Sequence, residues 1–181
     1  MGGTASPGFD VTPISAELLD DPVAFLSAEH VRQTVLLAHL ERLARKPGGP
    51  AAASMAQGLL HWLSEELPLH IADEEASLYP RLAPHDAEGT LATLSAEHRR
   101  DAQLVAEALD TLRGIVAGEP QPVAALTAIL GFVRLHREHL AVEEAKIMPL
   151  ARAVLTPAAR LALAGEMTVR RGLDRIADAK G

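Results

Sequence analysis

The chain has 181 residues, of which 48% are hydrophobic and 3% aromatic, and its formal net charge is −7. This length and apolar content suffice for one domain with a full core. The negative charge argues against nucleic acid as a partner, because phosphates require a basic face. The chain has no cysteine, which excludes disulfides, thiolate metal sites and iron–sulfur clusters.

The N-terminal residues and the hydropathy pattern predict a cytoplasmic protein without a membrane partner. No apolar run is long enough to cross a bilayer, and the N-terminus lacks the apolar segment of a signal peptide. Residues 1–12 carry Gly, Ser, Thr and Pro without periodicity, so we expect a flexible N-terminal tail there. Residues 13–181 are expected to form one helical domain.

Helical start and stop signals divide that domain. After a short helical turn from Thr12-Pro13 to about Asp20, four long helices are predicted over residues 21–46, 51–79, 90–118 and 122–148. Pro80 and Pro149 should end the second and fourth helices, and Pro68 should kink the second. A C-terminal helix from Thr156-Pro157 to about Ala179 should cover one face and carry no chemistry. The predicted fold class is all-α: an up-down-up-down four-helix bundle with an additional C-terminal helix.

One motif occurs twice. The stretch His70-Ile-Ala-Asp-Glu74-Glu75-Ala-Ser-Leu-Tyr-Pro80 returns as His139-Leu-Ala-Val-Glu143-Glu144-Ala-Lys-Ile-Met-Pro149. In each copy a histidine precedes a glutamate by four residues, which places both on one helical face. Upstream, Ser-Ala-Glu-His30 is echoed by Ser-Ala-Glu-His98. Helix lengths put all four histidines at one level of the bundle, on apolar stripes that face the core.

Two inward glutamates among four imidazoles leave two explanations. Buried carboxylates must be paired or must bind a cation, so the alternatives are ion pairs with protonated histidines or a metal site. Two copies at one level favour metal. Imidazole and carboxylate without sulfur suit iron, manganese or zinc. The expected ligands are His30, His70, Glu74, His98, His139 and Glu143, with both glutamates bridging two ions.

With these residues the chain resembles the hemerythrin-like (HHE cation-binding) domain family of non-haem di-iron four-helix bundles. The resemblance covers about residues 21–150 and implies two iron ions with an oxo or hydroxo bridge. Oxygen carriers of the family have a further histidine where this chain has Ala102, and His-x-x-x-x-Asp where it has His139-x-x-x-Glu143. The pattern is closer to a variant bacterial subgroup that reads His, His-x-x-x-Glu, His, His-x-x-x-Glu. That subgroup is associated with peroxide, oxygen or nitric oxide handling.

Other polar residues could surround such a site. Glu29, Glu97 and His136 could hydrogen-bond to the ligating histidines, and Asp101 could replace the missing ligand. Glu75 and Glu144 are interpreted as outer residues of the site or as surface residues. His39, His61 and His85 are interpreted as surface residues, and Tyr79 lies half a turn from His70, away from the metal.

The resemblance favours a di-iron protein that binds hydrogen peroxide or dioxygen and turns it over, as a catalase-like enzyme would. The alternative is a module that binds or senses iron, dioxygen or nitric oxide without turnover. A biosynthetic oxygenase would need an organic-substrate pocket, which a narrow aliphatic bundle does not suggest. A purely structural bundle is disfavoured by the inward glutamates. The sequence leaves the catalytic residues and the oligomeric state open.

Overall fold

The structure, a computed structural model, describes residues 14–173, and over that range all of its regular structure is helical. A 3-10 helix (Ala16–Asp20) is followed by four long rods and one shorter helix. The first rod is α1 (Pro22–Arg45). The second rod consists of α2 (Ala52–His61), α3 (Leu67–Asp73) and α4 (Tyr79–Leu82), which follow one another end to end. The third rod is α5 (Thr90–Val116), and the fourth is α6 (Val123–Val142) continued by α7 (Met148–Val154). A 3-10 turn (Ala83–His85) ends the second rod, and α8 (Pro157–Arg170) closes the described fold.

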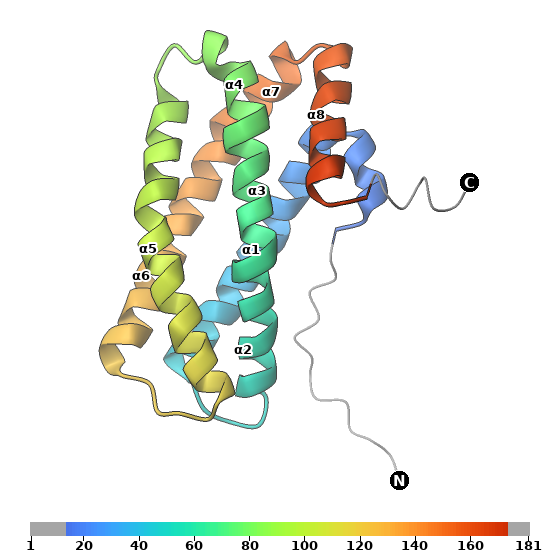
Figure 1. Cartoon of the computed structure of the whole chain (residues 1–181). Helices are drawn as coiled ribbons and strands as arrows, with labels where there is room; N and C mark the ends of the chain where they lie inside the picture. The colour runs from blue at the N-terminus through green and yellow to red at the C-terminus, as the bar shows by residue number, and fades with distance from the viewer. Residues whose placement is uncertain (1–13, 174–181) are drawn as a thin grey trace, which may run out of the picture.

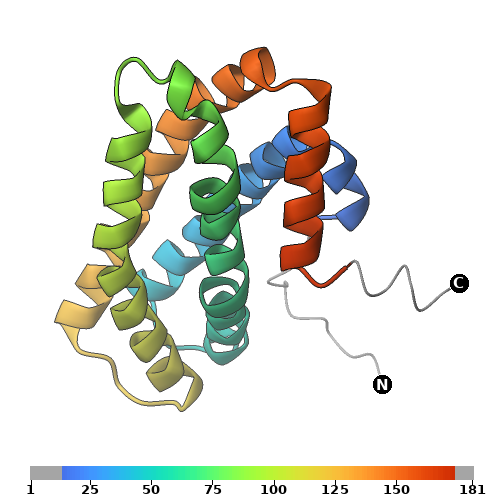
Figure 2. The same ribbon diagram turned by 45° about the horizontal axis from the view of Figure 1, so that its top comes forward.

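Successive rods run in opposite directions along the chain (Figure 1). Each rod packs against the next one, and the fourth returns to α1, so that the four enclose a common interior. The view in Figure 2 shows α8 on the outside of this group, where it packs against α1 and α3. Within the described residues, none of the helices is both long and apolar enough to span a membrane.

Two rods continue through prolines that were expected to end them. Pro80 and Pro149 each follow a π-helical turn, Glu74–Leu78 and Glu143–Ile147. In each turn the N–H of the residue before the proline bonds to the carbonyl five residues back. The wider turn accommodates the proline ring and its missing N–H, so the helix continues. Pro68 likewise follows a π-helical turn, Trp62–Glu66, and the helix continues through it.

The two ends of the described fold also differ from expectation. The first helical turn begins at Ala16 and is capped by Ser15, whose hydroxyl accepts the Glu17 N–H at 3.3 Å. The last helix was predicted to reach about Ala179 but ends at Arg170, because Gly172 adopts a left-handed φ of 67° that terminates it. The tail predicted over residues 1–12 lies outside the described residues.

A polar layer divides the interior into two apolar clusters. One cluster gathers around Leu37, Trp62 and Phe132 in the half that holds α2. The other gathers around Leu26, Leu78 and Met148, and α8 contributes Leu163 and Met167 to it. Buried histidines and glutamates of the first, second and fourth rods lie between the two clusters, together with the partly buried His98 of α5. The fold therefore holds a polar site that is shielded on both sides by packed aliphatic side chains.

Candidate metal centre

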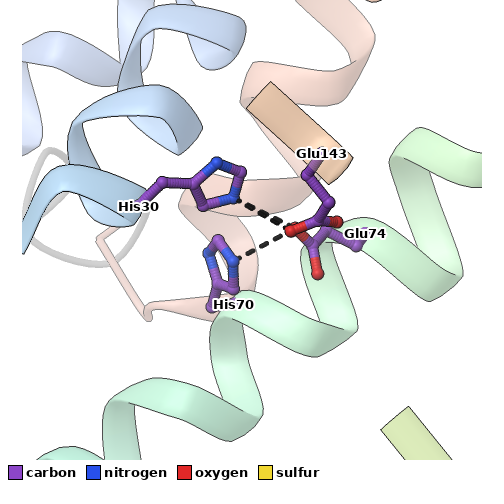
Figure 3. Close-up of side chains that lie close together, drawn as sticks. All are labelled: His30, His70, Glu74 and Glu143. Atoms are coloured by element: carbon purple, nitrogen blue, oxygen red, sulfur yellow. Dashed lines mark hydrogen bonds and ion pairs between the residues drawn. The ribbon is translucent and has the colours of Figure 1, made fainter. Parts of the chain in front are cut away.

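Four ligating atoms from three rods meet in the first half of this layer. The Nε2 atoms of His30 and His70 lie 3.4 and 3.1 Å from Glu74 Oε1, and His30 Nε2 lies 3.4 Å from Glu143 Oε2. All four side chains are almost fully buried. Figure 3 shows both imidazoles pointing at the two carboxylates. One potential ligand atom from each lies within 4.8 Å of every other, a geometry that could hold a metal ion.

The second half of the layer repeats the first. One potential ligand atom from each of Glu74, His98 and His139 lies within 4.8 Å of the others. His98 Nε2 is 3.5 Å from Glu74 Oε2, and His139 Nε2 is 3.4 Å from Glu143 Oε2. Glu74 therefore belongs to both groups, with one oxygen facing each. The six residues predicted from the sequence to bind metal all lie in this layer.

A ring of four outer carboxylates fixes the imidazoles. The Nδ1 of each histidine bonds to a glutamate on the neighbouring rod: His30 to Glu144 at 2.7 Å, His70 to Glu29 at 2.9 Å, His98 to Glu75 at 2.7 Å and His139 to Glu97 at 2.9 Å. Ionised carboxylates accept only, so each Nδ1 carries the proton. In a neutral imidazole the Nε2 lone pair is then free and directed inward.

The sequence partly indicated this ring. Glu29 and Glu97 were predicted to hydrogen-bond to the histidines, and both do so, each to a histidine on the next rod rather than to its own neighbour in the chain. Glu75 and Glu144 had been interpreted as outer or surface residues. Their position beside the motif glutamates in both copies of the repeat was the signal for a shared role.

Tyr79 was predicted to lie away from the site, and that prediction is wrong. Its hydroxyl donates to Glu143 Oε1 at 2.5 Å, and its ring stacks on His98 with centroids 6.1 Å apart and planes 5° apart. The π-helical turn Glu74–Leu78 inserts an extra residue into the helix, so later side chains are rotated by about 100° relative to an uninterrupted helix. Periodicity counted at 3.6 residues per turn therefore places Tyr79 on the wrong side.

The C-terminal helix also reaches the site, although it was expected to carry no chemistry. Arg171, just after α8, lies 2.7 Å from Asp73 and 3.3 Å from Glu29, the carboxylate that holds His70. Arg170 bonds to the other oxygen of Asp73. Asp73 is fully buried, and burial raises its pKa while the two arginines only partly offset that shift. Nothing in the pattern of α8 predicted these contacts.

The two remaining candidates take other positions. His136 does not join either ligand group; its Nε2 lies 2.7 Å from Gln33 Oε1, and its ring stacks on His139 with centroids 5.7 Å apart. Burial and the nearby His139 hold the pKa of His136 well below its usual range. Asp101 pairs with Arg100 at 2.7 Å instead of replacing a ligand.

His61 and His85 are exposed and His39 is half-buried, and all three lie outside the layer.

The charges within the layer are strongly coupled. Burial lowers the pKa of His30, but hydrogen bonds to Glu144 and Glu74 outweigh it and raise that pKa to about 9. Burial raises the pKa of Glu74, but His70 and His30 outweigh it and hold that pKa well below its usual range. Burial and the charge of Glu74 together raise the pKa of Glu143 to about 7. In the metal-free protein, protons on the imidazoles therefore compensate the Glu74 charge.

Ion pairing does not satisfy every group. Among the described residues, five buried nitrogen and oxygen atoms of the layer have no hydrogen-bond partner: Nε2 of His70, His98 and His139, and Oε2 of Glu74 and Glu143. Buried polar atoms without partners are rare and costly in native proteins. Nitrogen and carboxylate oxygen are also the donors that divalent iron, manganese and zinc accept. The residues present therefore fit bound metal ions.

Comparison with known families agrees with this fit. The family model described as Hemerythrin HHE cation binding domain matches residues 21–151, which include the whole polar layer. The chain therefore belongs to the hemerythrin HHE cation-binding domain family. Neither a comparison with curated proteins nor one with solved structures finds a match.

Proposed function

We propose that the protein binds two iron ions in the polar layer. His30 and His70 would hold one ion, His98 and His139 the other, and Glu74 and Glu143 would lie between them. The observation that carries this proposal is the set of five buried nitrogen and oxygen atoms that have no hydrogen-bond partner among the described residues and gather in one layer. Buried carboxylates are costly unless they are fully paired or bind a metal, so a bound cation would stabilise Glu74 and Glu143.

The outer glutamates prepare the histidines for this role. With Nδ1–H donated to a carboxylate, each imidazole keeps one tautomer and one orientation before a metal arrives. The carboxylate also makes the imidazole a stronger electron donor. The aliphatic clusters on both sides lower the polarity around the layer, which strengthens the charge interactions within it. These residues thus form a preorganised site for a cation pair.

The proposed ligands are hydrogen peroxide and dioxygen, with nitric oxide as a further small ligand, and the proposed reaction is peroxide dismutation. A bound iron pair would supply the exchange of electrons that dismutation requires. The chain supplies a hydrogen-bond donor next to it: the Tyr79 hydroxyl, which donates to Glu143 Oε1. Burial, together with the charges of Glu74 and Glu143, holds the pKa of Tyr79 far above its usual range, so this proton stays on the phenol. Tyr79 can therefore donate a hydrogen bond to a small ligand or to Glu143.

Oxygen evolution from hydrogen peroxide tests this proposal. Iron-loaded wild-type protein should release oxygen faster than the same concentration of free iron. His98→Ala should abolish that release, and Ala102→His should reduce it, because a further imidazole would occupy a position that alanine leaves open. Glu65→Gln, an exposed change outside the layer, is the matched control. If wild type binds two irons but releases no more oxygen than free iron, the protein binds its ligand without turnover.

A further inference from the structure

A cleft opens beside the polar layer, between the second rod and α5. Its volume is about 520 Å³, within the range of small-molecule sites. Apolar side chains form its walls and floor, chiefly Leu67, Ile71, Ala102, Val105 and Phe132. His98, Glu75 and His136 of the polar layer and its surroundings also line the cleft. The sequence did not suggest an apolar cleft of this size beside the layer.

Alanine at position 102 helps to keep this cleft open. Ala102 follows His98 by one helical turn, lines the cleft and is exposed to it. A longer side chain at this position would project into the same space. The cleft is thus adjacent to the point where this sequence departs from the oxygen carriers, and it does not depend on bound metal.

The polar groups around the cleft indicate the charge of an occupant. Both oxygens of Glu75 are engaged, one by His98 Nδ1 at 2.7 Å and one by the Ser95 hydroxyl at 2.9 Å. Asp101 is paired with Arg100. Arg99 also lines the cleft, is exposed, and has no ion-pair or hydrogen-bond partner among the described residues. Arg99 is therefore the charged side chain of the cleft that has no partner among the described residues.

We propose that this cleft binds a small organic acid with an apolar body. The apolar part would lie between Ile71 and Ala102 and point toward His98, and the carboxylate would lie at the rim against Arg99. Guanidinium and carboxylate form paired hydrogen bonds, which orient such a molecule. The Glu75 carboxyl group at the cleft disfavours the reverse orientation, with the acid directed toward His98. The molecule would thus lie next to the polar layer without replacing any of its residues.

Isothermal titration calorimetry with 4-phenylbutyrate and its neutral analogue 4-phenylbutanol tests the proposal. The acid should bind with a dissociation constant below about 1 mM and more tightly than the alcohol. Ala102→Leu should weaken both by more than about tenfold, since it fills the cleft. Arg99→Gln should weaken only the acid, by about three- to fivefold, the scale of an exposed ion pair.

Two exposed substitutions on α5 are the controls. Ala96→Leu and Arg113→Gln lie outside the cleft and should leave both affinities unchanged, and circular dichroism checks that every variant is folded. Equal binding of acid and alcohol by the wild type would overturn the assignment of the charge. Unchanged binding of the acid by the Ala102→Leu variant would overturn the assignment of the cleft.

Discussion

The two halves of the polar layer come from the same repeated motif but have different surroundings. In the first half, Glu29 holds His70 and is itself contacted by Arg171, so α8 closes that side of the layer. In the second half, Glu97 holds His139, and a cleft opens beside His98. Identical motifs can thus give one enclosed and one accessible position, because elements outside the repeat decide which side is covered.

The single residue that serves both halves is Glu74, and its replacement should have the largest effect. Glu74→Gln keeps the volume and removes the charge, so iron content should fall from about two ions per chain to below one. Metal stabilises a native state by about 2.7 kcal/mol at a hundredfold excess over its dissociation constant, and this gain should largely disappear. Elemental analysis and thermal melts with and without iron measure both effects. An unchanged melting temperature on adding iron to wild type would contradict the account.

The metal-free protein should lose stability as pH rises. His30 has a folded-state pKa of about 9, above its unfolded value of 6.5, so its contribution is fully present below pH 6.5 and is lost on the way to pH 9. The loss should be on the order of 3 kcal/mol at most. Urea denaturation of metal-free wild type and His30→Gln across this range measures it. A flat profile for the wild type, or the same slope in both proteins, would remove His30 as the cause.

The contact between Arg171, just after α8, and the first half of the polar layer should contribute less to the free energy of unfolding. Arg171→Gln leaves buried Asp73 with one arginine and frees Glu29, which should reduce the free energy of unfolding by about 2 kcal/mol. Arg81→Gln breaks a more exposed pair between Arg81 and Glu166 and should cost less than about 1 kcal/mol. Denaturant unfolding compares the two. If both variants lose the same stability, α8 does not support the layer.

Loss of the Tyr79 hydroxyl should reduce stability less than loss of the Arg171 guanidinium. Tyr79→Phe keeps the ring on His98 and removes one hydrogen bond to Glu143, which should cost about 1 kcal/mol. Iron content should stay near that of wild type, because the hydroxyl is not among the proposed ligands. Oxygen evolution should fall, because the variant loses the hydrogen bond that the phenol donates next to the proposed iron pair. A Phe variant with wild-type oxygen evolution would show that this hydrogen bond plays no part in the reaction.

The sequence predicted the residues of the layer better than their surroundings. The repeat places a histidine and a glutamate on one face in each copy, and that local relation survives because the His70–Glu74 spacing precedes the distorted turn. Tyr79 was misplaced because the π-helical turn changes the period after Glu74. Arg171 and the cleft follow from how α8 and Ala102 pack against distant residues, and no local pattern encodes such contacts.

The most direct test of two metal positions is a crystal structure of the iron-loaded protein with anomalous scattering recorded at the iron edge. Two iron peaks are expected in the polar layer, one between His30 and His70 and one between His98 and His139, with Glu74 in contact with both. A single peak, or iron bound only outside this layer, would contradict the account.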